Sequence, residues 1–295
     1  MMFYKKKKII WIGYEILFLG GIIAVFLFMK IIPFLMSIGY SFTSWNGVTS
    51  EIAFNGMDNF KTMLQDTEFW NSLIFTLKFA MMSVLLVNFL GFTFAYLLSK
   101  PLRGRNIFRV GFYIPNVLGG LILGFIWQFI FVKAFPAIGS ATGFGFFNLM
   151  WLATPATSFW GLVIVDAWQG MGYYMLLYIA GLTTVPKDCL ESADIDGASW
   201  YQKLFHVTIP LMMPTFTRCF FLSIVSSFKI YTLNMALTNG GPYLSSESIT
   251  MNIYRTAFTE NSMGYGTAKS LIAMIIIIVI TGIQVKLTSD REVEM

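Results

Sequence analysis

The sequence predicts an all-α polytopic membrane protein with six transmembrane helices. Of its 295 residues, 56% are hydrophobic and 12% carry a charge, whereas about 25% of the residues of a soluble domain are charged. Six apolar stretches reach or approach the length of about 20 residues with which a helix crosses the bilayer core. This composition excludes a soluble enzyme with a charged surface and an intrinsically disordered chain.

The six stretches are separated by polar connections and set the expected domain organisation. They cover roughly residues 9–29, 73–98, 110–132, 158–182, 216–237 and 270–287. The first stretch follows four lysines, but its apolar run exceeds the roughly 7–15 residues of a cleavable signal, so we expect a retained helix. Residues 1–70 are expected to hold this helix and the first outer loop, residues 71–287 the transmembrane core, and residues 288–295 a cytoplasmic tail.

The distribution of lysine and arginine predicts the orientation of the spans, because cytoplasmic connections carry an excess of these residues. The N-terminus, the connections at residues 99–109 and 183–210, and the C-terminal tail together carry eleven of them. The three connections on the other side carry five. Both termini are therefore expected in the cytoplasm, in agreement with an even number of spans.

The sequence contains no set of residues that points to catalysis, a cofactor or a metal. A P-loop requires the pattern Gly-x4-Gly-Lys-Ser/Thr, which does not occur. Two cysteines, Cys189 and Cys219, and the single His206 are too few for a disulfide framework or a metal site. The net charge of +5 is spread between apolar runs, so we expect no nucleic-acid partner. The chain is interpreted as a non-catalytic membrane subunit.

The connection at residues 183–210 carries the most informative motif, and its residues predict a compact helix–turn–helix on the cytoplasmic side. Asp188 and Glu191 would lie near the positive N-terminal end of a first short helix. Gly197 supplies a turn, and Ser199 is suited to cap a second short helix that runs through Phe205. The apolar side of this segment is too small to form a core of its own.

The spacing of this connection resembles that of a known family. The pattern Glu-x-Ala-x3-Gly-x9-[Val/Ile]-x-x-Pro, which begins at Glu191 and ends at Pro210, resembles the coupling motif of the membrane subunits of binding-protein-dependent ABC importers. The local form Glu-Ser-Ala-Asp-Ile-Asp-Gly-Ala is similar to that of the sugar-importing branch, to which maltose and glycerol-3-phosphate permeases belong. We call residues 183–210 the coupling loop.

The resemblance extends over most of the chain, with small departures inside the motif. Ser192, Val207 and Ile209 stand where Ala, Ile and Leu are usual, and all three are small or volume-conserving changes. Weaker matches occur in the expected order, among them Tyr113-Ile114-Pro115-Asn116 and Gly240-Gly241-Pro242.

The resemblance implies a type I ABC importer transmembrane fold in the inner membrane of a bacterial or archaeal cell. The chain would form half of the translocation pathway and would couple ATP hydrolysis on a separate subunit to alternating access. The implied partners are a second homologous permease subunit, two copies of a cytoplasmic ATPase subunit, an extracytoplasmic solute-binding protein, a carbohydrate substrate and membrane lipid. The residues that would transmit the ATPase movement are Glu191, Ser192, Ala193, Asp196, Gly197 and Ala198.

Ionisable residues inside membrane spans are costly and often functional, and Asp166 and Lys229 lie deepest in the predicted spans. Carboxylates and amides bind sugar hydroxyls, and aromatic rings pack on the apolar faces of sugars. The candidates for the substrate pathway are therefore Asp166, Trp168, Gln169, Tyr173, Tyr174, Lys229 and Asn234. Three structural explanations compete: Asp166 pairs with Lys229, the tyrosines pack between helices, or the polar groups face the second permease subunit.

Other functions are compatible with parts of the sequence. An importer permease for a peptide, an amino acid or a polyamine is the main alternative, and the matches around Ser41-Phe42 and Asp58-Asn59 argue against it. An ATP-independent carrier would leave the spacing of the coupling loop without a reason. A membrane enzyme is disfavoured because no His, Asp and Glu set occurs at a plausible membrane depth. A neutral sugar is favoured over a polyol phosphate, since few cations can be placed inside the spans.

Overall fold

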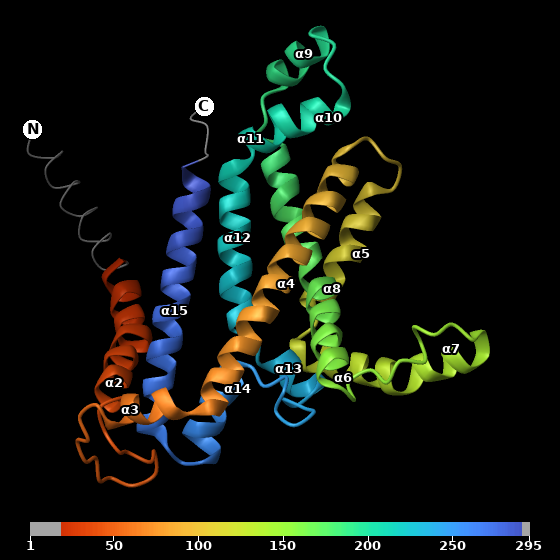
Figure 1. The fold of residues 1–295 in the computed structure, drawn as a ribbon. Helices are drawn as coiled ribbons and strands as arrows, with labels where there is room; N and C mark the ends of the chain where they lie inside the picture. Colours follow the sequence, from red (N-terminus) through yellow and green to blue (C-terminus); the bar gives the residue numbers. More distant parts are fainter. Residues whose placement is uncertain (1–18, 291–295) are drawn as a thin grey trace, which may run out of the picture. The chain divides into compact units, whose positions relative to one another are not determined.

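The computed structural model of the chain describes residues 19–290, and within them the secondary structure is helical apart from an isolated bridge between Thr43 and Phe54 (Figure 1). Five helices in this range are long and apolar enough to cross a membrane, or six if one bent pair counts as a single span. The predicted all-α membrane fold is therefore confirmed. The four N-terminal lysines, the start of the first predicted span and the end of the C-terminal tail lie outside the described residues.

The chain forms two compact units, one of Met1–Gln65 with Ile253–Leu271 and one of Asp66–Asn252 with Ile272–Met295. In the first unit, the apolar helix Leu19–Tyr40 contains the π-helical turn η1 (Leu27–Ile31) and α2 (Ile32–Tyr40), and α3 (Asp58–Gln65) follows after a loop. Asn59 of α3 holds this loop, because its Nδ2 donates to the carbonyl oxygens of Ser41 at 2.8 Å and Thr43 at 2.9 Å.

The first unit also contains the π-helical turn η4 (Arg255–Thr259) and the N-terminal part of α15 (Met263–Ser289). A buried lysine joins them, since Nζ of Lys269 donates to Oγ1 of Thr256 at 2.9 Å and lies 4.5 Å from the centre of the Tyr265 ring. Lys269 is thus a packed and hydrogen-bonded side chain.

The second unit is a helical bundle around α4 (Thr67–Ser99) and α8 (Pro155–Leu182), which pack along much of their lengths. α5 (Arg105–Val117) packs on α8, and α12 (Met213–Phe228) packs on α4. The backbone of α5 approaches α8 closely at Gly172, where a Cβ atom would lie only 2.6 Å from the carbonyl carbon of Phe112. Small residues allow such close approach between helices in membranes.

The connections of the second unit lie alternately at its two ends, as the distribution of lysine and arginine predicts (Figure 1). The α4–α5 connection, α9 (Lys187–Ile195), α10 (Trp200–Lys203) and the C-terminal end of α15 lie at one end. The N-terminal ends of α4 and α8 lie at the other end, with α13 (Thr232–Leu237) and the start of α14 (Ile249–Tyr254). We therefore refer to the two ends as cytoplasmic and extracytoplasmic.

The third span predicted at residues 110–132 is wrong in its bounds, because the helix breaks at Leu118 and Gly119. After the break, α6 (Gly120–Phe129) continues through the π-helical turn η2 (Ile130–Ala134) into α7 (Phe135–Thr142), at a steep angle to α8 (Figure 1). Leu118 and Gly119 both have extended backbone, with ψ values of 131° and 139°. Pro115-Asn116 and Gly119-Gly120 are turn signals at this point, but the apolar residues on both sides of them add up to the length of one span.

The fifth span predicted at residues 216–237 is also two helices. α12 ends at Phe228, and α13 begins only at Thr232. α13 packs on α6. Gly124 of α6 allows the two helices to approach closely, because a Cβ atom at this position would lie 3.2 Å from the backbone nitrogen of Leu237. A contact between segments far apart in the sequence therefore decides the direction of α13.

Candidate functional site

The coupling loop begins with α9, which ends in a tight hydrogen-bonded turn. The N–H of Ala198 donates to the carbonyl oxygen of Ala193 at 2.9 Å, and the N–H of Gly197 donates to the carbonyl oxygen of Asp194 at 3.1 Å. This pair of bonds is a Schellman motif, which places the residue after the helix in the left-handed region. Gly197 has a φ of +71°, which glycine adopts without the steric penalty of a Cβ atom. The turn predicted at Gly197 is confirmed.

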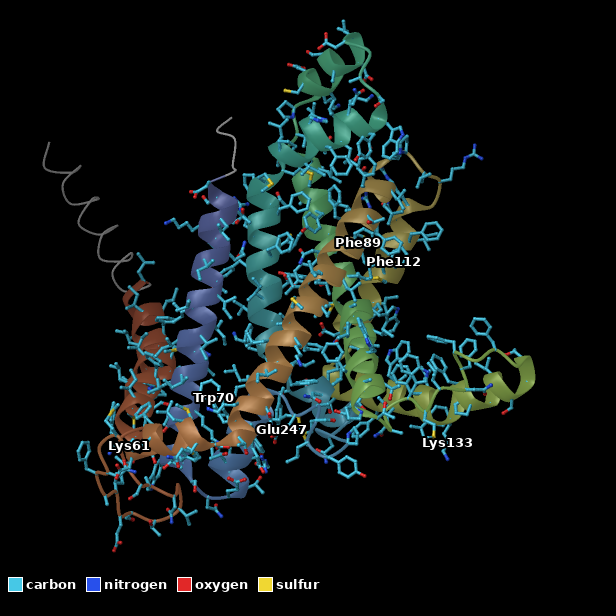
Figure 2. The ribbon with its side chains drawn as sticks, in the orientation of Figure 1. Lys61, Trp70, Phe89, Phe112, Lys133 and Glu247 are labelled. Atoms are coloured by element: carbon cyan, nitrogen blue, oxygen red, sulfur yellow. The ribbon has the colours of Figure 1, made fainter. Side chains whose placement is uncertain are left out.

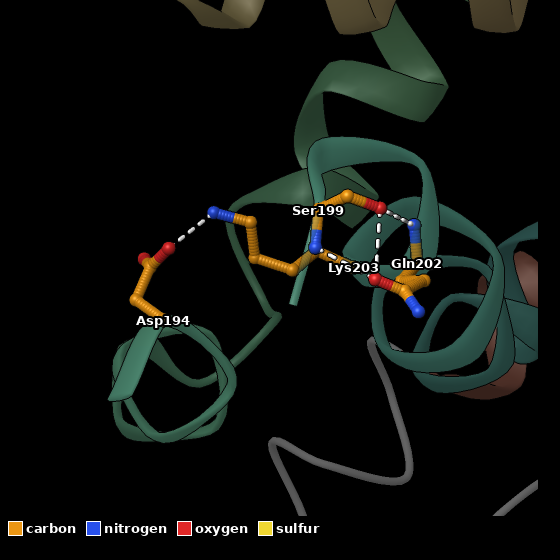
Figure 3. Close-up of polar contacts among 4 residues, drawn as sticks. All are labelled: Asp194, Ser199, Gln202 and Lys203. Carbon is orange, nitrogen blue, oxygen red and sulfur yellow. Dashed lines mark hydrogen bonds and ion pairs between the residues drawn. The ribbon is translucent and has the colours of Figure 1, made fainter. Parts of the chain in front are cut away.

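The second helix of the coupling loop, α10, begins at a capping box formed by Ser199 and Gln202 (Figure 3). Oγ of Ser199 accepts from the N–H of Gln202 at 3.4 Å, and Oε1 of Gln202 accepts from the N–H of Ser199 at 2.8 Å. Lys203 of α10 forms an ion pair with Asp194 of α9. The turn, the cap and the ion pair join the two short helices into one rigid element.

The coupling loop is also joined closely to two membrane helices. α9 follows α8 after residues 183–186, and α10 continues through the π-helical turn η3 (Leu204–Thr208) and α11 (Ile209–Leu211). The helical segments Trp200–Leu211 and Met213–Phe228 meet at a bend of 70°. Pro210 and Pro214 stand near the starts of α11 and α12 and lack the N–H that a continuous helix needs. A displacement of the coupling loop would therefore reach both α8 and α12.

The tip of the coupling loop exposes large apolar side chains at the cytoplasmic end of the bundle. Ile195 is 86% exposed, Trp200 64% and Tyr201 54%. Exposed apolar surface of this kind is typical of protein–protein contacts. The structure also brings the predicted coupling residues together on α9 and its turn, where Glu191, Ser192, Asp196 and Gly197 are exposed and Ala193 and Ala198 are half-buried.

Inside the bundle, a set of polar side chains joins α4, α8 and α12. Asp166 of α8 accepts a hydrogen bond from Ser83 of α4, and Oγ of Ser83 accepts from Ser227 of α12 at 3.4 Å. Lys229 is exposed just beyond the end of α12, and no ion pair between it and Asp166 occurs in the part of the chain that the structure describes. Asp166 is thus satisfied by a serine and not by Lys229.

A second polar set is centred on Asn88 of α4, which the sequence patterns do not single out. Its Nδ2 donates to Oγ of Ser223 on α12 at 2.9 Å, and its Oδ1 accepts from the hydroxyl of Tyr178 on α8 at 2.7 Å. Asn88 and Tyr178 are both buried. The signal that would have found this set is an amide side chain inside the apolar run of the second predicted span.

The family of the chain follows from a comparison of its sequence with those of known proteins. A family profile described as "Binding-protein-dependent transport system inner membrane component" matches residues 87–291. The chain belongs to this family. The resemblance and the inner-membrane location that the sequence predicted are therefore confirmed, and the chain is a component of a transport system.

Curated relatives match this inner-membrane component over nearly its whole length. It is 46% identical over 279 residues to the "Probable starch degradation products transport system permease protein AmyD" of Thermoanaerobacterium thermosulfurigenes, with 95% of each chain covered. It is 33% identical over 261 residues to the "Multiple sugar-binding transport system permease protein MsmF" of Streptococcus mutans, with 88% of this chain and 90% of the relative covered.

Solved structures share the fold of this inner-membrane component. A crystal structure of a bacterial ABC transporter involved in the import of the acidic polysaccharide alginate matches with a TM-score of 0.81 at 19% identity, covering 98% of this chain and 99% of that chain. A bacterial alginate ABC transporter in complex with an alginate pentasaccharide-bound periplasmic protein matches with a TM-score of 0.80 at 19% identity, covering 95% of both chains. The predicted type I ABC importer fold is confirmed.

In this inner-membrane component, the substrate candidates of α8 face different neighbours. Nε2 of Gln169 donates to the carbonyl oxygen of Leu118 at 3.1 Å, and the ring of Trp168 meets Trp127 of α6 edge-on with centres 5.5 Å apart. Tyr174 is buried beside Gly91 of α4, whereas Tyr173 is exposed. Gln169 and Tyr174 therefore support helix packing, while Trp168 and Tyr173 keep accessible surface.

Asn234, the candidate from the fifth predicted span, lies on α13 and holds the loop that follows it. Its Nδ2 donates to the carbonyl oxygen of Ser246 at 2.9 Å, and its Oδ1 accepts from Oγ1 of Thr238 at 2.7 Å. Asn234 is buried, and the polar atoms of its side chain are already engaged within the chain. Asn234 is therefore positioned to shape this loop.

Proposed function

We propose that the chain forms half of the translocation pathway of an ATP-driven importer of neutral carbohydrates. ATP hydrolysis would take place on separate cytoplasmic subunits, and the coupling loop would transmit their movement to the membrane helices. The observation that carries this proposal is the construction of the coupling loop, which is rigid, exposes apolar side chains at its tip and is joined closely to both α8 and α12.

The rigidity of the coupling loop suits it to transmit movement, because a flexible connection would absorb a displacement rather than pass it on. The turn at Gly197 and the capping box at Ser199 define the connection between α9 and α10, and the ion pair between Asp194 and Lys203 adds a contact between the two helices. A displacement of the tip would thus tilt α8 and α12 together. Coordinated tilting of packed helices is a recognised route between two discrete conformations, here an outward-facing and an inward-facing state.

The proposed assembly contains a second homologous permease subunit, two copies of a cytoplasmic ATPase subunit and an extracytoplasmic solute-binding protein. The family description, which names binding-protein-dependent transport, supports the last of these. The alginate transporter that shares the fold was solved with a periplasmic protein that carries an alginate pentasaccharide. We place the ATPase contact on Glu191, Ser192, Ala193, Asp196, Gly197 and Ala198, with Glu191 facing a basic group.

The names of the relatives support a carbohydrate as the substrate, since one is named for starch degradation products and another for multiple sugars. We therefore take short neutral glucans as the substrate class. Asp166 and Tyr173 are seven residues apart on α8 and so lie on the same side of that helix. We place the saccharide there, with the carboxylate accepting from sugar hydroxyls and the ring packing on an apolar sugar face.

The proposal is tested in proteoliposomes that contain the chain, its partner permease, the ATPase and the binding protein. Maltotriose uptake and ATP hydrolysis are measured together. Glu191→Arg is expected to leave assembly intact and to abolish the stimulation of ATP hydrolysis by the loaded binding protein. Glu51→Arg, a charge reversal at an exposed residue of the first loop, is the matched control and should leave both rates unchanged.

Two results would overturn this function. The first is maltotriose uptake by the chain without ATPase subunits. The second is normal coupling in Glu191→Arg.

A further inference from the structure

We propose that the chain carries a separate carbohydrate-binding site at its extracytoplasmic end, which receives a neutral saccharide before the saccharide enters the membrane pathway. This inference rests on the proposed import function. The observation behind it is a cavity of about 650 Å³ in the second unit, between α4, α8 and the loop that joins α13 to α14. A cavity of this volume lies within the range of small-molecule sites.

The two helices line the cavity with polar side chains and aromatic rings. Along α4, residues with helical spacing line the cavity, namely Glu68, Asn71, Ile74, Phe75 and Lys78, because positions three and four apart share one side of a helix. From α8, Phe159 meets Phe75 edge to face with ring centres 6.0 Å apart. Polar groups and an apolar ring surface thus lie within one cavity, which is the mixture that sugar recognition requires.

The loop at residues 238–248 borders the cavity and is held in one shape by hydrogen bonds. Oγ of Ser246 donates to the carbonyl oxygen of Gly241 at 2.6 Å, and Oγ of Ser248 donates to the carbonyl oxygen of Ile230 at 2.8 Å. The N–H of Ile249 then donates to Oγ1 of Thr76 on α4 at 2.8 Å. A loop fixed in this way loses little conformational entropy when a ligand binds.

The loop presents two side chains to the cavity that suit a saccharide, Tyr243 and Ser245. Tyr243 is 98% exposed and lines the cavity, so its ring is free to pack against a sugar. Ser245 borders the cavity, and its buried Oγ has no hydrogen-bond partner among the described residues. Rotation of this hydroxyl toward a sugar hydroxyl would remove the cost of leaving it unsatisfied. Glu247 lies beside the N-terminal half of α4 (Figure 2), where it is buried and accepts a hydrogen bond from Nδ2 of Asn252 at 3.1 Å.

The charges around the cavity indicate which saccharides it accepts. Glu68 and Glu247 carry carboxylates and Lys78 carries an ammonium group, so the lining has a formal charge of −1 at neutral pH. A carboxylate in a partly buried site disfavours a second negative charge nearby. The cavity is therefore suited to neutral saccharides and unsuited to uronates.

The test measures saccharide binding to the complete transporter in lipid nanodiscs, without binding protein, by isothermal titration calorimetry. Maltotriose is the neutral probe and trigalacturonate is the acidic probe of the same length. Wild type is expected to bind maltotriose at least tenfold more tightly than trigalacturonate. Tyr243→Ala is expected to raise the Kd of maltotriose roughly fivefold to tenfold, the size of a lost aromatic contact. Glu68→Gln is expected to reduce the ratio between the Kd values of trigalacturonate and maltotriose.

The control variant is Phe144→Ala, which removes another exposed aromatic ring of the second unit that does not line the cavity. Its Kd for maltotriose should equal that of wild type. ATP-driven uptake of maltotriose is measured in the same preparations. If wild type imports maltotriose but Tyr243→Ala binds it normally, the cavity is not the receiving site and the import function stands.

Two further outcomes are informative. In a separate titration, the solute-binding protein is added to the same nanodiscs. If Tyr243→Ala weakens its binding but leaves the Kd of maltotriose unchanged, the loop is a protein-docking surface and the saccharide site is overturned. If wild type imports no neutral saccharide at all, the proposed function itself fails.

Discussion

The side-chain amide of Gln169 in α8 donates a hydrogen bond of 3.1 Å to the carbonyl oxygen of Leu118, where the chain passes from α5 to α6. Carbonyl groups at a helix end lack partners within the helix, and the hydrocarbon core of a membrane offers no water to replace them. Gln169 therefore stabilises the break in the third span.

Replacing Gln169 by leucine is expected to destabilise the transporter. Gln169→Leu leaves the half-buried carbonyl group of Leu118 without its donor, and side-chain hydrogen bonds between membrane helices contribute about 0.6 kcal/mol on average and up to about 1.7 kcal/mol. Thermal unfolding of the purified complex measures the loss. Gln128→Leu is the matched control, because the corresponding bond from Gln128 to Leu237 is 3.5 Å long and its loss should matter less. An unchanged melting temperature with a raised KM for maltotriose would instead make Gln169 a substrate contact.

The coupling loop could be predicted from the sequence because its structure is decided locally. Gly197 meets the demand for a left-handed residue, and Ser199 caps the helix that follows it. Both effects act within a few residues of the chain. The breaks near Leu118 and Lys229 are harder to predict, because Gly119-Gly120 and Lys229 interrupt the apolar runs without showing in which direction the next helix continues. The packing of α13 on α6 decides that direction at the second break.

The hydrogen-bond partners of the polar residues in the bundle could not be predicted from the sequence either. The sequence marks Asp166 as unusual, but it does not say that Ser83 on another helix satisfies it. It also gives no reason to connect Asn88 with Tyr178, which lie 90 residues apart in the chain. Partners across helices depend on rotation and register, which composition does not contain.

Gly197→Ala is expected to weaken coupling. An alanine at a φ of +71° costs about 1 kcal/mol or more in the left-handed region, and the strain would loosen the turn between α9 and α10. We expect fewer maltotriose molecules imported for each ATP hydrolysed. Gly197→Asn should retain more coupling, because asparagine tolerates this conformation.

Gly143→Ala is the control for this experiment. Gly143 also has a φ of +71° and also follows a helix, α7, which lies outside the coupling loop. The Gly143→Ala variant should lose a similar amount of local stability, but it should import as many maltotriose molecules per ATP hydrolysed as the wild type. Equal effects of the two substitutions on that ratio would show that general destabilisation, and not the coupling loop, is being measured.

The ion pair between Asp194 and Lys203 should affect coupling far more than stability. Asp194 is largely exposed, and exposed ion pairs contribute about 0–1 kcal/mol, so Lys203→Glu should leave the melting temperature nearly unchanged. It should nevertheless reduce maltotriose uptake, because α9 and α10 would no longer be fixed to each other. The double variant Asp194→Lys with Lys203→Glu should recover uptake.

The control is Lys61→Glu, which reverses the charge of a lysine that pairs with Asp58 at 3.0 Å within α3. This variant should leave coupling intact. Failure of the double variant to recover any uptake would count against a coupling role for the Asp194–Lys203 pair.

Tyr178→Phe is expected to loosen the contact between α4 and α8. The substitution removes the hydroxyl that donates to Oδ1 of Asn88 at 2.7 Å and leaves a buried acceptor unpaired. Side-chain hydrogen bonds between membrane helices contribute about 0.6 kcal/mol on average and up to about 1.7 kcal/mol, so a small but measurable drop in unfolding free energy should result. Tyr174→Phe is the matched control on the same helix, because the hydroxyl of Tyr174 makes no hydrogen bond within the described residues. If both variants melt alike while only Tyr178→Phe alters maltotriose transport, the hydroxyl of Tyr178 acts on the substrate pathway and not on helix packing.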